Sequence, residues 1–200
     1  MQKVDDTMTK ENIIIASLRL FLMRGYASVS LIDVAKEVGI TKGGIYHYFS
    51  SKEELLNVAI YFFLDRFEEK YINLLNKNKS IQDILECLLV KQEQEEYVAA
   101  LLGTKGSCNI DYAHSGIEIV RKIPGVLARM EQINAIFCEL FTKKIDEAIQ
   151  AGQIKDCADS YALAVNIVSM VNGYKSLGEQ FQTEPMRKRL ANNIWQLIKK

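Results

Sequence analysis

The sequence predicts an all-α protein, and three observations support this prediction. The 200 residues include only two prolines, Pro124 and Pro185. Between Ile45 and Leu102 there is neither proline nor glycine, the two residues that interrupt helices most strongly. In several segments apolar residues recur three and four positions apart, which is the period of a helix with one buried face. We therefore expect helices and no sheet.

The first helix is expected from about Thr9 to Arg24, because an apolar face at helical spacing precedes Gly25, a typical C-terminal stop. That face consists of Ile13, Ala16, Leu20 and Phe21. Ser30, with Asp33 three residues later, is a capping signal for a second, short helix that Gly39 ends.

Two further capping signals follow at once. Thr41 can cap a third helix that continues through Tyr48. Ser51 and Glu54 have the spacing of a capping box, which predicts a fourth helix that reaches about Asn76. This long fourth helix is expected to connect an N-terminal unit of about 50 residues to the rest of the chain, since no linker of disordered composition separates them.

The remaining helices are expected from the same kinds of signal. Ser80 and Asp83 open a helix through Leu102, and the segment from Gly103 to Ser107 reads as the loop that closes it. The other expected helices are Ile110 to Lys122, Pro124 to Ala151 with Gly152 as its stop, a helix that Asp156 and Asp159 open and that reaches about Gly178, and a last helix that Pro185 begins.

Composition narrows the possible functions. Lys and Arg together number 25 and are balanced by 25 Asp and Glu, so net charge gives no indication of nucleic-acid binding. The longest nearly apolar run, Tyr161 to Val171, is much shorter than the roughly 20 residues that span a bilayer. The segment MQKVDDTMTKEN mixes acidic and basic residues and lacks the apolar core that a secretory signal would have. We expect a cytoplasmic protein without a membrane partner.

The four cysteines give no indication of a metal centre or redox motif. They are Cys87, Cys108, Cys138 and Cys157, and no two of them form the close pair that such sites use. We expect reduced and mostly buried thiols, with no metal and no cofactor. Asp111 and His114, three residues apart, could share a helix face and hold a metal, but the sequence offers no third ligand.

The segment between the second and third helices has the spacing of a helix-turn-helix. A small residue, Ala35, precedes Gly39 and Ile40 at the turn, and Ile45 supplies an apolar side chain behind it. In such a motif the second helix lies in the DNA major groove. Gly43 and Gly44 then lie in its first turn, where missing side chains let the backbone approach DNA and backbone N–H groups can face a phosphate.

The aromatic cluster of the third helix divides by helical geometry. Ile45 and Phe49, four apart, are expected to face inward. Tyr46, His47 and part of Tyr48 are left for the groove or the sugar–phosphate edge, although the alternative is that these rings complete a small core. The candidate DNA-binding residues, with Lys52 as a phosphate contact, are Ser30, Thr41, Lys42, Gly43, Gly44, Tyr46, His47, Tyr48 and Lys52.

From Ile13 to Leu56 the chain resembles the N-terminal domain of the TetR (tetracycline repressor) family of bacterial transcription regulators. The segment GITKGGIYHYFSSKEEL carries most of the resemblance. Two positions depart from the family pattern: Tyr48 stands where histidine is usual, and Ser17 where alanine is usual. The resemblance implies residues 1–52 as a three-helix DNA-binding domain and residues 53–200 as a helical effector-binding and dimerisation domain.

A homodimer is expected, because a protein that reads a palindrome needs two-fold symmetry. Small residues form a stripe between Ala158 and Gly173, and the last helix offers an apolar side; both could instead pack within one subunit. The candidate interface residues are Ala162, Val165, Ser169, Gly173, Leu190, Ile194, Trp195, Leu197 and Ile198.

The middle helices could enclose a pocket for a small-molecule effector. The candidate lining residues, each of which could also be plain core, are Tyr97, Tyr112, His114, Phe137, Phe141, Met170 and Tyr174.

The sequence thus predicts a ligand-responsive transcriptional regulator, a repressor that leaves a palindromic double-stranded DNA operator when a small molecule binds. Two alternatives remain open. One is a helical enzyme that processes a small molecule, although the chain holds only two histidines and no grouped nucleophile and base. The other is a nucleoid-type helix-turn-helix module without a ligand.

Overall fold

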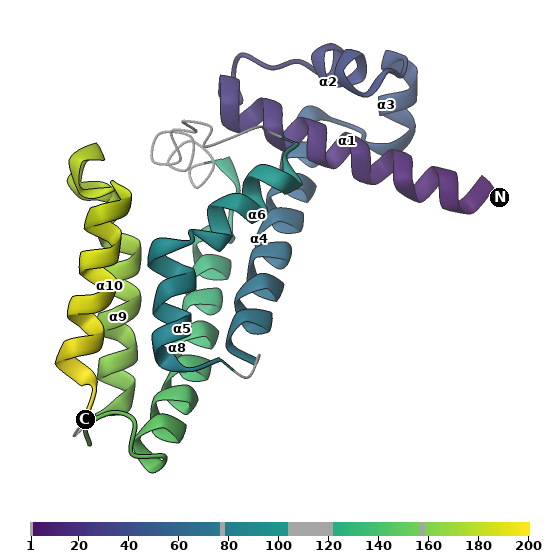
Figure 1. The fold of residues 1–200 in the computed structure, drawn as a ribbon. Helices are drawn as coiled ribbons and strands as arrows, with labels where there is room; N and C mark the ends of the chain where they lie inside the picture. Colours follow the sequence, from purple (N-terminus) through teal and green to yellow (C-terminus); the bar gives the residue numbers. More distant parts are fainter. Residues whose placement is uncertain (1, 77–78, 104–121, 157–158) are drawn as a thin grey trace. The chain divides into compact units, whose positions relative to one another are not determined.

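The computed structural model describes residues 2–76, 79–103, 122–156 and 159–200, and the regular elements in these ranges are helices (Figure 1). An isolated bridge pairs Ile154 with Lys199. The all-α prediction is confirmed. Within the described ranges no helix combines the length and the apolarity that a bilayer crossing requires. The α-helices are α1 (Gln2–Arg24), α2 (Leu31–Val38), α3 (Lys42–Tyr48), α4 (Lys52–Asn76), α5 (Ile81–Leu85), α6 (Glu93–Leu101), α8 (Val126–Gln150), α9 (Ser160–Gly173) and α10 (Glu184–Ile198).

The chain forms two compact units. The first contains Met1–Arg66 and Glu96–Met130, and the second contains Phe67–Glu95 and Glu131–Lys200. Three helices, α4, α6 and α8, contribute residues to both units. The predicted division at residue 52 stays a prediction.

In the first unit, α1, α2 and α3 pack around a small apolar core. Figure 1 shows these three helices next to one another. Phe21 of α1, Val34 of α2 and Ile45 of α3 are almost completely buried in it. Ser17 is also fully buried, and its hydroxyl donates a hydrogen bond of 2.8 Å to the carbonyl of Ile14. The departure from alanine at this position is accommodated, because the buried hydroxyl has a partner within its own helix.

The second unit has its own apolar core, to which α4, α5, α8, α9 and α10 contribute. Phe141 and Ile145 of α8 lie at its centre with no exposed surface. Tyr71 packs edge-on against Phe67 and Phe137, with ring centroids 4.6 and 4.4 Å apart. Burial raises the pKa of Tyr71 far above its ordinary value, so the phenol stays neutral.

One predicted helix, from Ser80 to Leu102, is wrong as a single element. The structure has α5, then a π-helical turn η1 (Glu86–Val90), and then α6. The N–H of Lys91 donates to the carbonyl of Glu86 at 2.9 Å, which is the π-helical spacing of five residues. Gln92 then has a positive φ of 50°, which a right-handed helix does not allow, so the helix is interrupted there. The sequence carries no glycine or proline at this break.

Several helix ends also differ from the prediction. Helix α1 begins at Gln2 instead of Thr9, and α8 begins at Val126 because Gly125 has a positive φ of 87°. Helix α9 ends at Gly173, and a 3₁₀ turn, η2 (Tyr174–Leu177), follows it; a second 3₁₀ turn is η3 (Glu179–Phe181). The predicted helix from Ile110 to Lys122 lies almost entirely outside the described residues.

Candidate nucleic-acid interface

Helix α2 begins with the capping box that the sequence predicts. The N–H of Asp33 donates to the Ser30 hydroxyl oxygen at 3.2 Å, and the N–H of Ser30 donates to the Asp33 carboxylate at 2.8 Å. The Ser30 hydroxyl also donates to this carboxylate, and these hydrogen bonds hold the pKa of Asp33 below its ordinary value of 3.8. Ser30, a predicted DNA contact, therefore already has a structural partner.

The turn after α2 closes with paired backbone hydrogen bonds. Gly39 has a positive φ of 77°, and its N–H donates to the carbonyl of Lys36, while the N–H of Ile40 donates to the carbonyl of Ala35 at 3.0 Å. This is the Schellman arrangement, which glycine permits because it has no Cβ. It fixes the direction in which the chain enters α3.

Helix α3 separates an inward from an outward face, as the sequence predicts. Ile45 and Phe49 are 0% and 1% exposed, whereas Tyr46 is 49% exposed. His47 is exposed as well, and its ring meets that of Tyr48 edge-on with centroids 5.0 Å apart. The ammonium of Lys42 lies over the ring of Tyr46, 5.7 Å from its centroid. The exposed face thus presents a cation and rings that can meet phosphates and thymine methyl groups.

The two glycines of α3 have different surroundings. The N–H of Gly44 donates to the hydroxyl oxygen of Thr41 at 3.1 Å, so this N–H is part of the helix cap. A Cβ at Gly44 would lie 3.6 Å from the side chain of Ile40, which is ordinary contact, and so would point back toward the turn. A Cβ at Gly43 would meet only the Thr41 hydroxyl, at 3.8 Å, and Gly43 is exposed.

Lys52, the predicted phosphate contact, is the first residue of α4 and lies over the ring of Tyr26 with its ammonium 4.0 Å from the centroid. The same ammonium donates to the carbonyl of Tyr26. A second ammonium, from Lys122, lies 4.8 Å from that ring centroid. No pattern in the sequence predicts that two ammonium groups lie over the ring of Tyr26. The role of Lys52 toward DNA stays a prediction.

Tyr48 also has a partner that lies far away in the sequence. Its hydroxyl donates to the carboxylate of Asp6 on α1. Tyr48 stands where the family resemblance leads one to expect histidine, and the longer phenol reaches this acidic residue. Asp6 was not among the residues singled out from the sequence.

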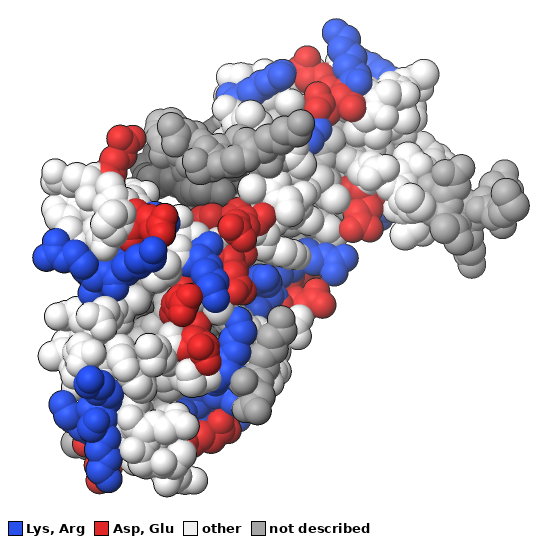
Figure 2. Space-filling view, in the orientation of Figure 1, with Lys and Arg blue, Asp and Glu red and all other residues white. Residues whose placement is uncertain are grey.

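The charges around α2 and α3 are mixed. Between Ser30 and Lys52 the chain has three lysines and two acidic residues, which leaves a net charge of plus one. Figure 2 shows basic and acidic side chains close together over this end of the chain on the visible face. A single copy therefore offers weak electrostatic attraction for DNA, because phosphate neutralisation supplies most non-specific affinity.

The predicted pocket residues do not form one group. Phe137, Phe141 and Tyr174 are buried in the core of the second unit, whereas Met170 is 46% exposed and Tyr97 belongs to the first unit. Burial raises the pKa of Tyr174, whose hydroxyl lies 3.5 Å from the side-chain amide of Gln92. The remaining pocket candidates, Tyr112 and His114, lie outside the described residues. Asp111, the possible metal ligand beside His114, lies outside them as well.

A groove of the second unit holds residues that the sequence did not assign to a pocket. It lies between the α5–η1 segment and α10 and encloses about 190 Å³. This is smaller than the roughly 300 Å³ or more of typical ligand sites. Its lining residues are Gln82, Leu85, Glu86, Val90, Lys188, Ala191, Asn192 and Trp195.

The predicted dimer residues differ in exposure. The stripe on α9 is exposed in the single chain: Ala162, Val165, Ser169 and Gly173. On α10, Leu197 is 66% exposed, but Ile194 is buried and packs in the core of the same unit. Three further α10 residues are partly buried against that core: Leu190, Trp195 and Ile198.

Comparison with known proteins identifies the helix-turn-helix segment. Residues 13–59 match the model of the "Bacterial regulatory proteins, tetR family". The uncharacterised regulator YerO of Bacillus subtilis is 42% identical over 77 residues, which are 38% of this chain and 24% of YerO. The regulator PksA of Bacillus subtilis is 25% identical over 172 residues, which are 81% of this chain and 80% of PksA.

The similarity extends to the whole fold. A putative transcriptional regulator from Saccharomonospora viridis, solved in complex with choline, has a TM-score of 0.71 at 20% identity. The matched region covers 97% of this chain and 99% of the regulator. At this identity the likeness concerns the fold. The chain spans about a quarter of the length of YerO and of the regulator YuxN of Bacillus subtilis, which is 40% identical over 72 residues.

Proposed function

We propose that this chain, whose residues 13–59 match the tetR family of bacterial regulatory proteins, is a sequence-specific DNA-binding regulator of transcription. It acts as a repressor on a palindromic operator and leaves the operator when a small molecule binds. The DNA-binding domain consists of residues 1–52, and residues 53–200 supply effector binding and dimerisation. We place its action in the cytoplasm, and we propose no enzymatic activity for it.

The observation that carries the proposal is the two-faced helix α3 behind a fixed turn. Ile45 and Phe49 anchor the helix in the core, and the Schellman turn at Gly39 sets its direction. Lys42, Tyr46 and His47 are then left exposed on a helix of the kind that enters a major groove.

A homodimer supplies what one copy lacks. Two copies add their lysines and place two α3 helices on half-sites about one helical turn apart. The exposed stripe of α9 supports this proposal, because small side chains let two helices approach closely. Ile194 already packs within its own subunit, so α10 offers chiefly Leu197 to a partner.

The effector is proposed to bind the helical part after α4. The regulator from Saccharomonospora viridis, of similar fold, was solved with choline, a small organic molecule. In this chain the effector would favour a conformation whose α3 helices do not fit adjacent grooves, so that the population shifts away from the bound state. Helix α4, which belongs to both units, is the proposed connection.

The test is footprinting of the full-length protein on the DNA next to its own gene. A short palindromic footprint that appears at nanomolar to micromolar protein supports the regulator. Uniform coverage without preferred sequence would instead support the nucleoid-type module, and the absence of binding at low salt would refute both. A library of small molecules is then screened for release of the bound duplex, which tests the effector separately.

A further inference from the structure

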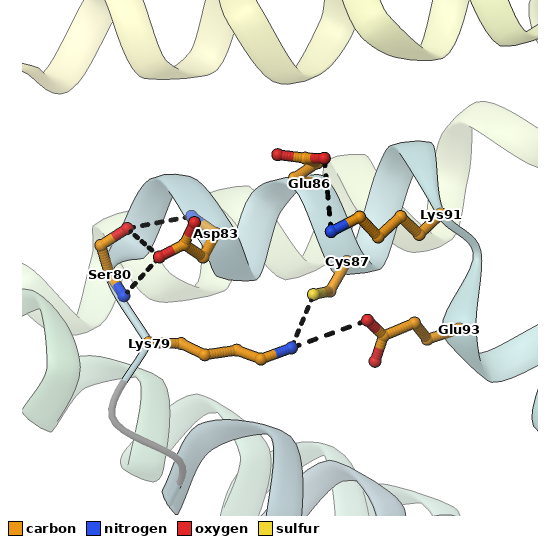
Figure 3. Close-up of polar contacts among 7 residues, drawn as sticks. All are labelled: Lys79, Ser80, Asp83, Glu86, Cys87, Lys91 and Glu93. Atoms are coloured by element: carbon orange, nitrogen blue, oxygen red, sulfur yellow. Dashed lines mark hydrogen bonds and ion pairs between the residues drawn. The ribbon is translucent and has the colours of Figure 1, made fainter.

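Helix α6 is held at its beginning by a lysine. The ammonium of Lys79 lies 3.6 Å from the carboxylate of Glu93, the first residue of α6, and 2.8 Å from Sγ of Cys87 in η1 (Figure 3). All three residues belong to the second unit. The positive φ of Gln92 separates α6 from η1, and the contacts of Lys79 link the residues on the two sides of this break.

At its other end α6 is held by an arginine of the first unit. Nη1 of Arg19 donates to the carbonyl of Leu102 at 2.9 Å, just after the last helical residue. The final carbonyls of a helix have no partner within it, so a side-chain donor there satisfies a group that burial would otherwise leave unpaired. Gly103 has a positive φ of 63°, and a Cβ on it would lie 3.1 Å from Nη1. Glycine therefore leaves room for the guanidinium.

The same guanidinium also holds α2. Nη2 of Arg19 donates to the carboxylate of Glu37 and forms an ion pair with it. The two side chains are 26% and 36% exposed, so water screens this pair only in part. A guanidinium presents several donors in a rigid plane, which lets one side chain hold two acceptors in fixed geometry, whereas a lysine ammonium has no such fork. Arg19 thus joins α1, α2 and the end of α6.

We propose that Arg19 is the positioning residue that couples the end of α6 to the DNA-binding helices. In the conformation that binds DNA, Arg19 contacts Leu102 and Glu37 together. A movement of α6 that withdraws the Leu102 carbonyl leaves the guanidinium with Glu37 alone and releases α2, against which α3 packs. This inference rests on the proposed function. Because coupling is reciprocal, binding of the operator must in turn stabilise the end of α6.

That reciprocity allows a test without the effector. Amide hydrogen exchange is measured on the full-length protein, with and without the palindromic duplex found by footprinting. The reporters are the N–H groups of Leu102 and Gly103, which donate to the carbonyls of Val98 and Ala100 at 2.9 and 3.1 Å. In the parent protein the duplex should slow their exchange by roughly 5-fold or more, the lower range of typical coupling.

Two variants and one control decide the outcome. Arg19→Met and Glu37→Gln should still bind the duplex but lose the slowing at Leu102 and Gly103. The control, Lys79→Met, removes the cation at the other end of α6 and should retain the slowed exchange at Leu102 and Gly103. Unchanged slowing in either variant, equal loss in the control, or no slowing in a parent that binds the duplex overturns the proposal. A parent that binds no duplex overturns the proposed function instead. If Arg19→Met does not fold, Glu37→Gln, at a side chain that is 36% exposed, gives the same answer.

Discussion

At the scale of single residues, α3 shows how one short helix serves stability and recognition with different side chains. Ile45 and Phe49 have almost no exposed surface, whereas the side chain of Tyr46 is half exposed and its ring lies beside the Lys42 ammonium. The glycines divide in the same way: Gly44 faces the turn and Gly43 faces outward. The consequences of substitution should therefore differ between neighbouring positions.

The glycine pair gives a direct test of close approach to DNA. Neither glycine has a positive φ, and a methyl group fits at both, so Gly43→Ala and Gly44→Ala should each stabilise the protein by up to about 1 kcal/mol. Only Gly43→Ala should weaken operator binding, since its methyl group points outward. Thermal melts and operator titrations measure both effects. Gly39→Ala is the control and should destabilise, because its φ is 77°. Equal operator affinity in all stable variants would contradict the prediction.

The two aromatic positions test the face assignment. Phe49→Ala leaves a cavity in a fully buried site and should cost about 3–5 kcal/mol of unfolding free energy. Tyr46→Ala should change stability by less than about 1 kcal/mol and reduce operator affinity, since its ring is half exposed. Urea unfolding and operator titration provide the two readouts. Similar destabilisation by both substitutions would place Tyr46 in the core.

At the scale of elements, α2, α3 and α4 each begin at a side-chain cap. Ser30 and Asp33 start α2, Thr41 starts α3, and the Ser51 hydroxyl accepts from the N–H of Glu54 at the start of α4 at 3.0 Å. The Glu54 carboxylate reaches the N–H of Ser50 at 2.7 Å instead of completing the box with Ser51. Such bonds join residues only three or four apart, so they form wherever the helix forms.

The α2 capping box should make stability depend on pH in a defined window. Because the Ser30 bonds hold the folded pKa of Asp33 below 3.8, their contribution is present above pH 3.8 and is lost as pH falls through the lower folded value. Ser30→Ala should therefore lower Tm near neutral pH, and its difference from the parent should shrink in strong acid. Scanning calorimetry between pH 7 and pH 2 measures this difference. A constant difference over that range would argue against the carboxylate as the source.

At the scale of the whole molecule, DNA recognition depends on assembly. One copy carries a net charge of plus one between Ser30 and Lys52, which is too little to neutralise many phosphates. The proposed dimer doubles the contacts and gives the two-fold symmetry of a palindrome. The exposed stripe of α9 is the surface on which this proposal depends.

A charge placed in that stripe should separate the copies. Val165 is 37% exposed, and Val165→Glu would bury an unpaired carboxylate in the proposed interface. The variant should sediment as a monomer at concentrations where the parent is a dimer, with weaker operator binding. Leu127→Glu, at a 55% exposed apolar residue of the first unit, is the matched control and should remain dimeric. A dimeric Val165→Glu variant would place the interface elsewhere.

The sequence by itself determined the helical class, the helix-turn-helix and the inward and outward faces of α3. Each depends on residues within a few positions: caps such as Ser30, the turn glycine Gly39, and apolar spacing such as Ile45 with Phe49. Local hydrogen bonds and helical period follow from chain geometry, so a pattern in the sequence is sufficient to predict them.

Only the tertiary structure decided which distant groups meet. Arg19 reaches a carbonyl 83 residues away, and Lys52 reaches the carbonyl of Tyr26, 26 residues away. The break at Gln92 likewise lies in a stretch without glycine or proline, where local propensity favours a continuous helix. Such features arise from packing between elements, which can overcome helix preferences worth less than about 1 kcal/mol per residue. No short pattern in the sequence records them, because their partners come together only when the chain has folded.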